Sequence, residues 1–132
     1  MLGRLIIPPI SAASGRPLYE QIVHGFKTEI SAGRLAAGSP LPSFRVLAED
    51  LTVSVITVKR AYEELEREGI IYRKQGLGTF VAERGGDRSR EVKLERSREL
   101  LAQAVKEAVE AGLGSREITE LLQTVIAENV KL

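Results

Sequence analysis

The sequence predicts a mostly helical α+β fold, in which three helices lead into a β-hairpin and two further helices follow. Three observations predict it. Apolar residues recur with helical spacing from Pro17 onward, two β-prone runs at residues 70–72 and 79–81 flank a glycine-containing loop, and helical spacing returns toward the end of the chain. We therefore divide the chain into residues 1–84 and residues 85–132.

The first helix is expected to run from Pro17 to Gly33. Apolar side chains recur every four residues from Leu18 to Ile30, and proline and glycine suit the first helical position and the helix end. Residues 34–42 follow and contain a glycine and two prolines. This composition predicts a turn-rich connector.

The amino-terminal run predicts a short strand or arm at Leu5–Ile7. Pro8 and Pro9 interrupt it before it reaches the ~7 to 15 apolar residues of a signal peptide or the ~20 of a membrane helix. No other stretch is long and apolar enough to span a bilayer, and the chain contains no cysteine. We therefore expect a protein of the reducing cytoplasm with no membrane partner, disulfide or thiolate metal site.

The second helix is expected to be short. Ser43 is placed to cap its first turn with the side-chain oxygen. The helix then runs through Leu51, with Val46 and Leu47 also facing inward. The two residues after Leu51 leave room only for a tight turn.

The third helix is expected to begin after Ser54, which can cap it, and to end at about Glu68, before Gly69. Apolar residues at i, i+3, i+4 and i+7 define its inward face. They are Val58, Ala61, Tyr62 and Leu65.

The stretch after the hairpin changes character. Residues 83–90 contain two adjacent glycines and almost no apolar residue, which predicts a linker. Helical patterns then cover residues 90–111 and 115–130, and a turn at residues 112–114 joins them.

Three helices with a tight turn between the second and third, followed by a hairpin, are typical of a winged helix-turn-helix. Five short motifs occur in order between residues 17 and 81: PLYEQI, LPS-x-R, VS-xx-TV, A-x-x-x-L-x-x-x-G and G-x-GTFV. This stretch, about residues 14–83, resembles the DNA-binding domain of the GntR family of bacterial transcription regulators. The resemblance implies a domain that binds double-stranded operator DNA.

In such a domain the third helix lies in the major groove. The resemblance implies that Ser54 and Thr57 contact phosphate or bases and that Lys59 contacts the DNA backbone. It places Arg45 in the groove or at its rim, where arginine suits bidentate contact with guanine. The alternative is that Arg45 pairs with Glu49. The candidate DNA-binding residues of these helices are Ser43, Arg45, Ser54, Val55, Ile56, Thr57, Lys59 and Arg60.

The sequence departs from the family pattern at the start of the third helix. Many members carry arginine at the position of Val55, and Ile56 follows it here. Contacts with thymine methyl groups are one interpretation. Packing inward, or against a dimer mate, is the other. Thr52 stands where the family often has glycine, and because threonine disfavours positive φ we expect a different turn geometry.

The hairpin loop is the other half of the implied site. Gly76 and Gly78 allow close approach of the backbone to DNA. Arg73, Lys74 and Gln75 supply donors for phosphates and for the minor groove. The alternative is that the glycines serve only to form the turn.

The carboxy-terminal helical hairpin is too small to bury a core alone, so its apolar stripes predict a partner. A second copy of the chain is the simplest partner, because a helix-turn-helix protein usually reads two half-sites as a two-fold dimer. The alternative is packing against its own DNA-binding domain. The candidate dimerisation residues are Leu94, Leu101, Val105, Ala108, Ile118, Leu121, Leu122, Val125 and Ile126.

The short two-helix region resembles the YtrA subfamily of GntR regulators. This resemblance implies a repressor, of a transporter operon in the typical case. The hairpin is too short to enclose the ~300 Å³ of a small-molecule pocket, so an effector, if there is one, is expected at the dimer interface. The sequence does not identify an effector.

The formal net charge is only +1, from 19 basic and 18 acidic residues, so DNA binding must depend on where the charges lie. No enzyme or cofactor is expected. The single histidine, His24, has no evident nucleophile or metal-ligand partner, and the glutamates between Glu63 and Glu68 are typical of a solvated helix face. A winged helix that binds protein or RNA is the alternative function. The basic hairpin together with Arg45 favours DNA.

Overall fold

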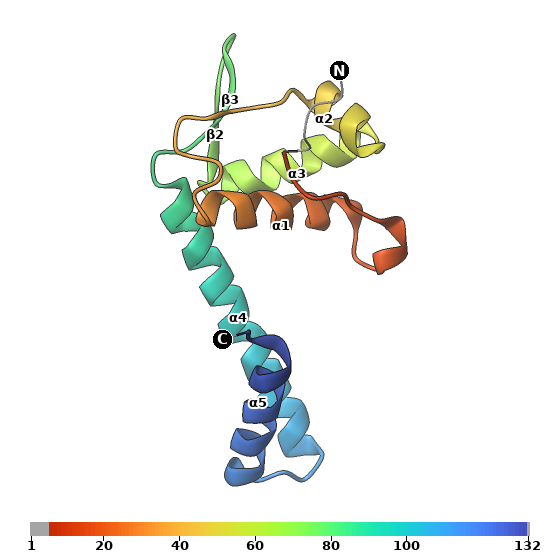
Figure 1. The fold of residues 1–132 in the computed structure, drawn as a ribbon, viewed down its shortest axis with the longest axis vertical. Coiled ribbons are helices and arrows are strands. Elements are labelled where there is room, and N and C mark those ends of the chain that lie inside the picture. Colours follow the sequence, from red (N-terminus) through yellow and green to blue (C-terminus); the bar gives the residue numbers. More distant parts are fainter. Residues whose placement is uncertain (1–5, 132) are drawn as a thin grey trace. The chain divides into compact units, whose positions relative to one another are not determined.

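The computed structural model describes residues 6–131 of the 132-residue chain. Figure 1 shows the order of its elements, and the predicted mostly helical α+β class is confirmed. The elements are one 3₁₀ turn at Ala12–Ser14, α1 (Leu18–Ser31), β1 (Pro40–Leu41), α2 (Phe44–Leu51), α3 (Val55–Arg67), β2 (Ile71–Lys74), β3 (Gly78–Val81), α4 (Gly85–Glu110) and α5 (Ser115–Asn129). Residues up to Val92 form one compact unit and residues from Lys93 onward a second.

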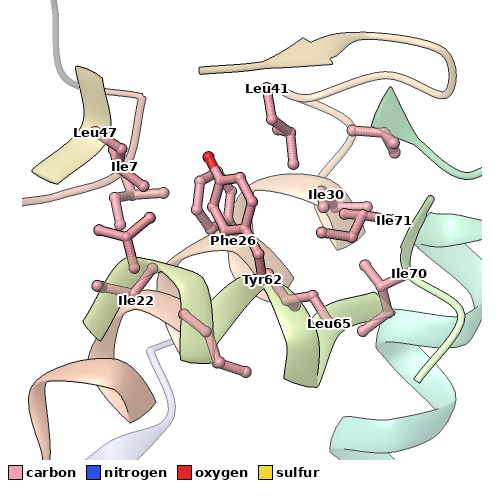
Figure 2. Packing of buried hydrophobic residues seen from close by; sticks show 14 of the residues in the cluster. Ile7, Ile22, Phe26, Ile30, Leu41, Leu47, Tyr62, Leu65, Ile70 and Ile71 are labelled. Carbon is pink, nitrogen blue, oxygen red and sulfur yellow. The ribbon is translucent and has the colours of Figure 1, made fainter. Parts of the chain in front are cut away.

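The core of the first unit lies where α1, α2 and α3 meet (Figure 2). Tyr62 is at its centre, and its ring makes edge-to-face contacts with Phe26 at 5.7 Å and with Phe44 at 5.2 Å between centroids. The Tyr62 hydroxyl donates a 2.7 Å hydrogen bond to the carbonyl oxygen of Pro42. Burial raises the pKa of this tyrosine, because the phenolate would lose its hydration.

The predicted inward face of α3 is confirmed, since Val58, Ala61, Tyr62 and Leu65 are all buried. On α2, however, Val46 is 48% exposed, so its predicted inward position is wrong. Residues 47, 48 and 51 of α2 are buried instead. Successive residues of a helix are 100° apart, so a face centred on Leu47, Ala48 and Leu51 turns Val46 toward solvent.

Both predicted helix caps are present. The Ser43 hydroxyl oxygen accepts a 3.2 Å hydrogen bond from the backbone N–H of Val46.

Between α2 and α3, Thr52 takes a left-handed conformation with φ of 58°, and no other described non-glycine residue has a positive φ. The expectation of a different turn geometry is therefore wrong, because threonine here takes the conformation that glycine adopts easily. Such a conformation costs a residue with a Cβ about 1–2 kcal/mol.

The sheet has three antiparallel strands in the order β1-β3-β2. The predicted hairpin pairs Ile71 with Val81 and Lys74 with Gly78. Strand β1 was not predicted, because its two residues lie in the stretch that the sequence marks only as a connector. It pairs with β3 some forty positions further along, as Pro40 lies opposite Phe80. A prolyl residue tolerates this edge position because it has no N–H to leave unpaired.

The predicted linker at residues 83–90 is wrong, because α4 already begins at Gly85. A Cβ at Gly85 would lie 2.7 Å from the carbonyl oxygen of Ile70, so the glycine serves close packing rather than flexibility. One turn later the buried Ser89 hydroxyl donates a 2.8 Å hydrogen bond to the carbonyl oxygen of Lys27. The first turns of α4 therefore belong to the first unit.

The amino-terminal prediction is only partly testable, because Leu5 lies outside the described residues. Ile7 forms no strand and is buried in the core, 3.1 Å from the position that a Cβ on Gly25 would take. The short turn that follows is held by Gln21, whose side-chain amide donates to the carbonyl oxygens of Ser11 and Arg16 at 2.8 and 3.0 Å.

In the second unit, the predicted turn at residues 112–114 separates α4 from α5. The Glu117 carboxylate accepts a 3.0 Å hydrogen bond from the backbone N–H of Gly114 and so caps the amino-terminal end of α5. None of the described helices is long and apolar enough to cross a membrane.

Candidate nucleic-acid interface

The first turn of α3 carries two hydroxyl groups that bond to each other. The Ser54 and Thr57 hydroxyl oxygens are 2.8 Å apart, and the Ser54 oxygen also accepts a 3.1 Å hydrogen bond from the N–H of Thr57. Two hydroxyls have two donor hydrogens, and the mutual bond uses one of them. One hydrogen remains for a phosphate oxygen or a base edge.

The two apolar residues of this turn point away from the core. Ile56 is 79% exposed and Val55 is 44% exposed, whereas Val58 is fully buried. Inward packing of Ile56, one of the interpretations left open by the sequence, is therefore wrong. The same outward face continues with Lys59 and Arg60, which are exposed as well.

Arg45 is exposed on α2, and no ion pair or hydrogen bond joins its side chain to another described residue. The alternative that it pairs with Glu49 is therefore wrong. Instead, both residues line one shallow open depression between α2 and the start of α3. The other lining residues are Ala48, Thr52, Val53, Ser54 and Val55.

Ion pairing divides the basic side chains of the first unit into two groups. Most of those outside α2, the start of α3 and the hairpin pair with carboxylates: Lys27 with Glu68, Arg34 with Glu29, Arg67 with Glu64, Arg84 with Asp87 and Glu91, Arg88 with Glu91, and Arg90 with Asp87. Within the described part of this unit, the basic residues without an ion pair are Arg16, Arg45, Lys59, Arg60, Arg73 and Lys74. Apart from Arg16, these are the cations among the candidate DNA-binding residues.

The Arg34–Glu29 pair illustrates the paired group. Its two hydrogen bonds, of 2.9 and 2.8 Å, lower the pKa of Glu29, because the guanidinium stabilises the carboxylate form. An arginine held in this way has part of its charge already neutralised. The unpaired cations keep their full charge for an external anion.

Two of the unpaired arginines stack on aromatic rings. The guanidinium carbon of Arg60 lies 3.8 Å from the ring centroid of Tyr19 on α1, and that of Arg73 on β2 lies 5.1 Å from Phe44 on α2. A stacked guanidinium keeps its hydrogen-bond donors at the edge of its plane, so stacking orients these arginines without neutralising them. Sequence analysis missed both contacts, because their partners lie far away along the chain.

The hairpin of β2 and β3 extends away from the helices in Figure 1. Tyr72 and Phe80 stack across its two strands at 5.6 Å between centroids. Gly76 at the tip has a φ of 79°, and a 2.9 Å hydrogen bond from the N–H of Leu77 to the carbonyl oxygen of Lys74 closes the turn. Lys74, Gln75 and Gly76 are exposed, as the predicted contact with DNA requires.

The candidate dimerisation residues lie along both helices of the second unit. Leu94, Leu101 and Val105 on α4 are 73%, 51% and 44% exposed. On α5 the exposed residues of this set are Leu121, Leu122, Val125 and Ile126. Ala108 and Ile118, on either side of the turn, are half-buried. Such a row of exposed large apolar side chains is typical of an interaction surface.

The described residues contain no group of three or more histidine, aspartate and glutamate side chains that could hold a metal ion. His24 is exposed on α1, as expected. The glutamates between Glu63 and Glu68 are partly engaged in the ion pairs with Arg67 and Lys27.

Comparisons with known proteins agree with this geometry. Residues 18–81 match the family described as bacterial regulatory proteins, gntR family. The chain is 35% identical over 119 residues to the HTH-type transcriptional repressor YtrA of Bacillus subtilis, which is 90% of this chain and 92% of that protein. The chain belongs to the GntR family.

Two solved structures show the same relationship. A GntR family transcriptional regulator from Listeria monocytogenes superimposes with a TM-score of 0.69 at 33% identity, covering 84% of this chain and 96% of that one. The DNA-binding domain of AraR, in complex with operator ORE1, superimposes with a TM-score of 0.50 at 30% identity, covering 56% of this chain and 90% of that one. The protein is therefore a DNA-binding transcriptional regulator of the GntR family and not an enzyme.

Proposed function

We propose that this regulator is a dimeric repressor that occupies a two-fold operator. The observation that carries the proposal is the distribution of ion pairs. The cations of α2, the first turns of α3 and the hairpin have no carboxylate partner, while most others in the same unit are paired. Because the net charge is only +1, this local surplus of positive charge is what directs DNA to one face.

In this proposal each part of the face has its own role. Arg45 reads a guanine in the major groove, and Lys59 contacts a phosphate beside it. Lys74 and the backbone at Gly76 bind at the adjacent minor groove. The remaining proposed contacts are those of Ser43, Ser54, Val55, Ile56, Thr57, Arg60, Arg73 and Gln75.

The second copy in this proposal binds through α4 and α5. Burying the exposed apolar side chains of these helices requires a complementary apolar surface. An identical helical hairpin provides one by two-fold symmetry. The two DNA-binding domains of such a dimer bind the two half-sites of one operator. Repression follows from occupying DNA that the polymerase needs. The repressor role is supported by the name of the YtrA relative, and control of a transporter operon rests on the resemblance to that subfamily alone.

The test begins by selecting bound duplexes from a random pool with the full-length protein. We expect one enriched sequence with two inverted half-sites, bound by two protomers as measured by analytical ultracentrifugation of the complex. Enrichment of no sequence, or a complex with one protomer on a single site, would contradict the proposal.

A pair of variants tests the dimer surface. Leu101→Glu places a charge among the exposed apolar residues of α4, whereas Arg98→Glu changes an exposed charged residue of the same helix. We expect the first variant to sediment as a monomer and to lose operator binding, and the second to remain dimeric. A dimer of unchanged stability in the Leu101 variant would refute this assignment.

A further inference from the structure

Resting on the proposed function, we infer that Val55 and Ile56 determine specificity by contacting thymine methyl groups in the major groove. The starting point is their exposure. An isoleucine that is 79% exposed contributes little to the core, and its neighbour Val55 is 44% exposed while also lining the depression beside Arg45. These apolar side chains therefore occupy the surface from which bases would be read.

The polar groups of the same turn leave one hydroxyl hydrogen for a direct polar contact with a base or a phosphate. Ser54 and Thr57 bond to each other, and the Ser54 oxygen also caps the helix. The two exposed side chains between these hydroxyls, Val55 and Ile56, are hydrocarbon. In the major groove the only apolar group that differs between base pairs is the C5-methyl group of thymine, so a hydrocarbon surface there favours A·T pairs over G·C pairs.

The cations beside this apolar surface favour DNA over a protein as its partner. Ile56 is followed on the outward face of α3 by Lys59 and Arg60, neither of which has a carboxylate partner among the described residues. A second protein chain covering Ile56 would have to bury or neutralise both cations, whereas a DNA duplex supplies phosphates on either side of the groove. Arg45 lines the same depression as Val55, so the proposed guanine contact lies close to the inferred thymine contact. The inferred half-site therefore combines a G·C pair with neighbouring thymines.

The experiment removes the methyl group and nothing else. In the operator selected by the full-length protein, each thymine is replaced in turn, in both half-sites, by deoxyuridine, which keeps every hydrogen-bonding group. At one or two thymines we expect the affinity of the unmodified protein to fall about fourfold for each half-site, the effect of one buried methyl group. At the thymine that Ile56 contacts, the Ile56→Ala variant should bind the thymine and deoxyuridine operators equally, and Ile56→Val should retain part of the discrimination.

The outcomes separate this inference from the function on which it rests. An enriched two-fold site whose affinity is unaffected by deoxyuridine at every position would overturn the methyl contact and leave the repressor proposal standing. A pool that yields no enriched site would overturn both. Loss of dimer stability in Ile56→Ala without DNA would also overturn the inference, because it would show that Ile56 packs against a second copy.

Discussion

Replacing Lys59 by glutamine tests whether the unpaired cations bind phosphates. Lys59 is exposed and has no ion pair within the described part of the chain, so its charge is available to DNA. A phosphate contact contributes about −0.9 to the slope of log K against log salt concentration for duplex DNA. The proposed dimer carries the residue twice, so the variant should bind with a slope that is about 1.8 less steep.

The assay is fluorescence anisotropy of the selected operator at several salt concentrations. Arg67→Gln is the matched control, because Arg67 lies on the same helix and is 73% exposed but is paired with Glu64. We expect its slope to equal that of the unmodified protein. An unchanged slope in the Lys59 variant, or equal changes in both variants, would refute the reasoning that pairing decides which cations meet DNA.

Four further substitutions test individual features. Arg45→Ala should lower operator affinity by about 1–3 kcal/mol without changing the melting temperature; unchanged affinity would show that another residue reads the base. Thr52→Asn should raise the free energy of unfolding by about 1 kcal/mol in urea titrations, because asparagine tolerates the left-handed conformation. Gly85→Ala should lower that free energy by about 1–3 kcal/mol, whereas Gly86→Ala, where a Cβ meets only ordinary contacts, should not. Because burial raises the pKa of Tyr62, the free energy of unfolding should keep the full contribution of the protonated hydroxyl below about pH 10 and lose it progressively above that pH. Tyr62→Phe should therefore show a smaller alkaline loss of unfolding free energy.

Features that depend on neighbours along the chain were predictable. Ser43 and Ser54 were identified as caps because a hydroxyl before a helical pattern can reach the free N–H groups of the first turn. The inward face of α3 followed from the spacing of its apolar residues. On α2 the same method misplaced Val46, since a helix of two turns has too few apolar positions to define the centre of its face.

The hardest features to predict were those in which the same residue type can serve two different structural roles. Adjacent glycines near residue 85 indicate a flexible linker when only composition is considered. In the folded chain, Gly85 lacks a side chain because the backbone of Ile70 passes too close for one. The same choice of residue thus serves packing, and only the position of the neighbouring strand distinguishes the two.

The sequence by itself determined the winged helix-turn-helix domain, through its helices, their caps, the hairpin and the motifs typical of the GntR family. The tertiary structure decided which charges are free to act. Arg60 stacks on Tyr19 and Lys27 pairs with Glu68 across about forty residues of chain, while Arg45 and Lys59 are left without partners. The physical reason is that helical spacing, capping and the ion pairs between residues three to seven positions apart are set locally. Lys27 and Arg60 instead contact side chains about forty positions away, which only folding brings within about 4 Å.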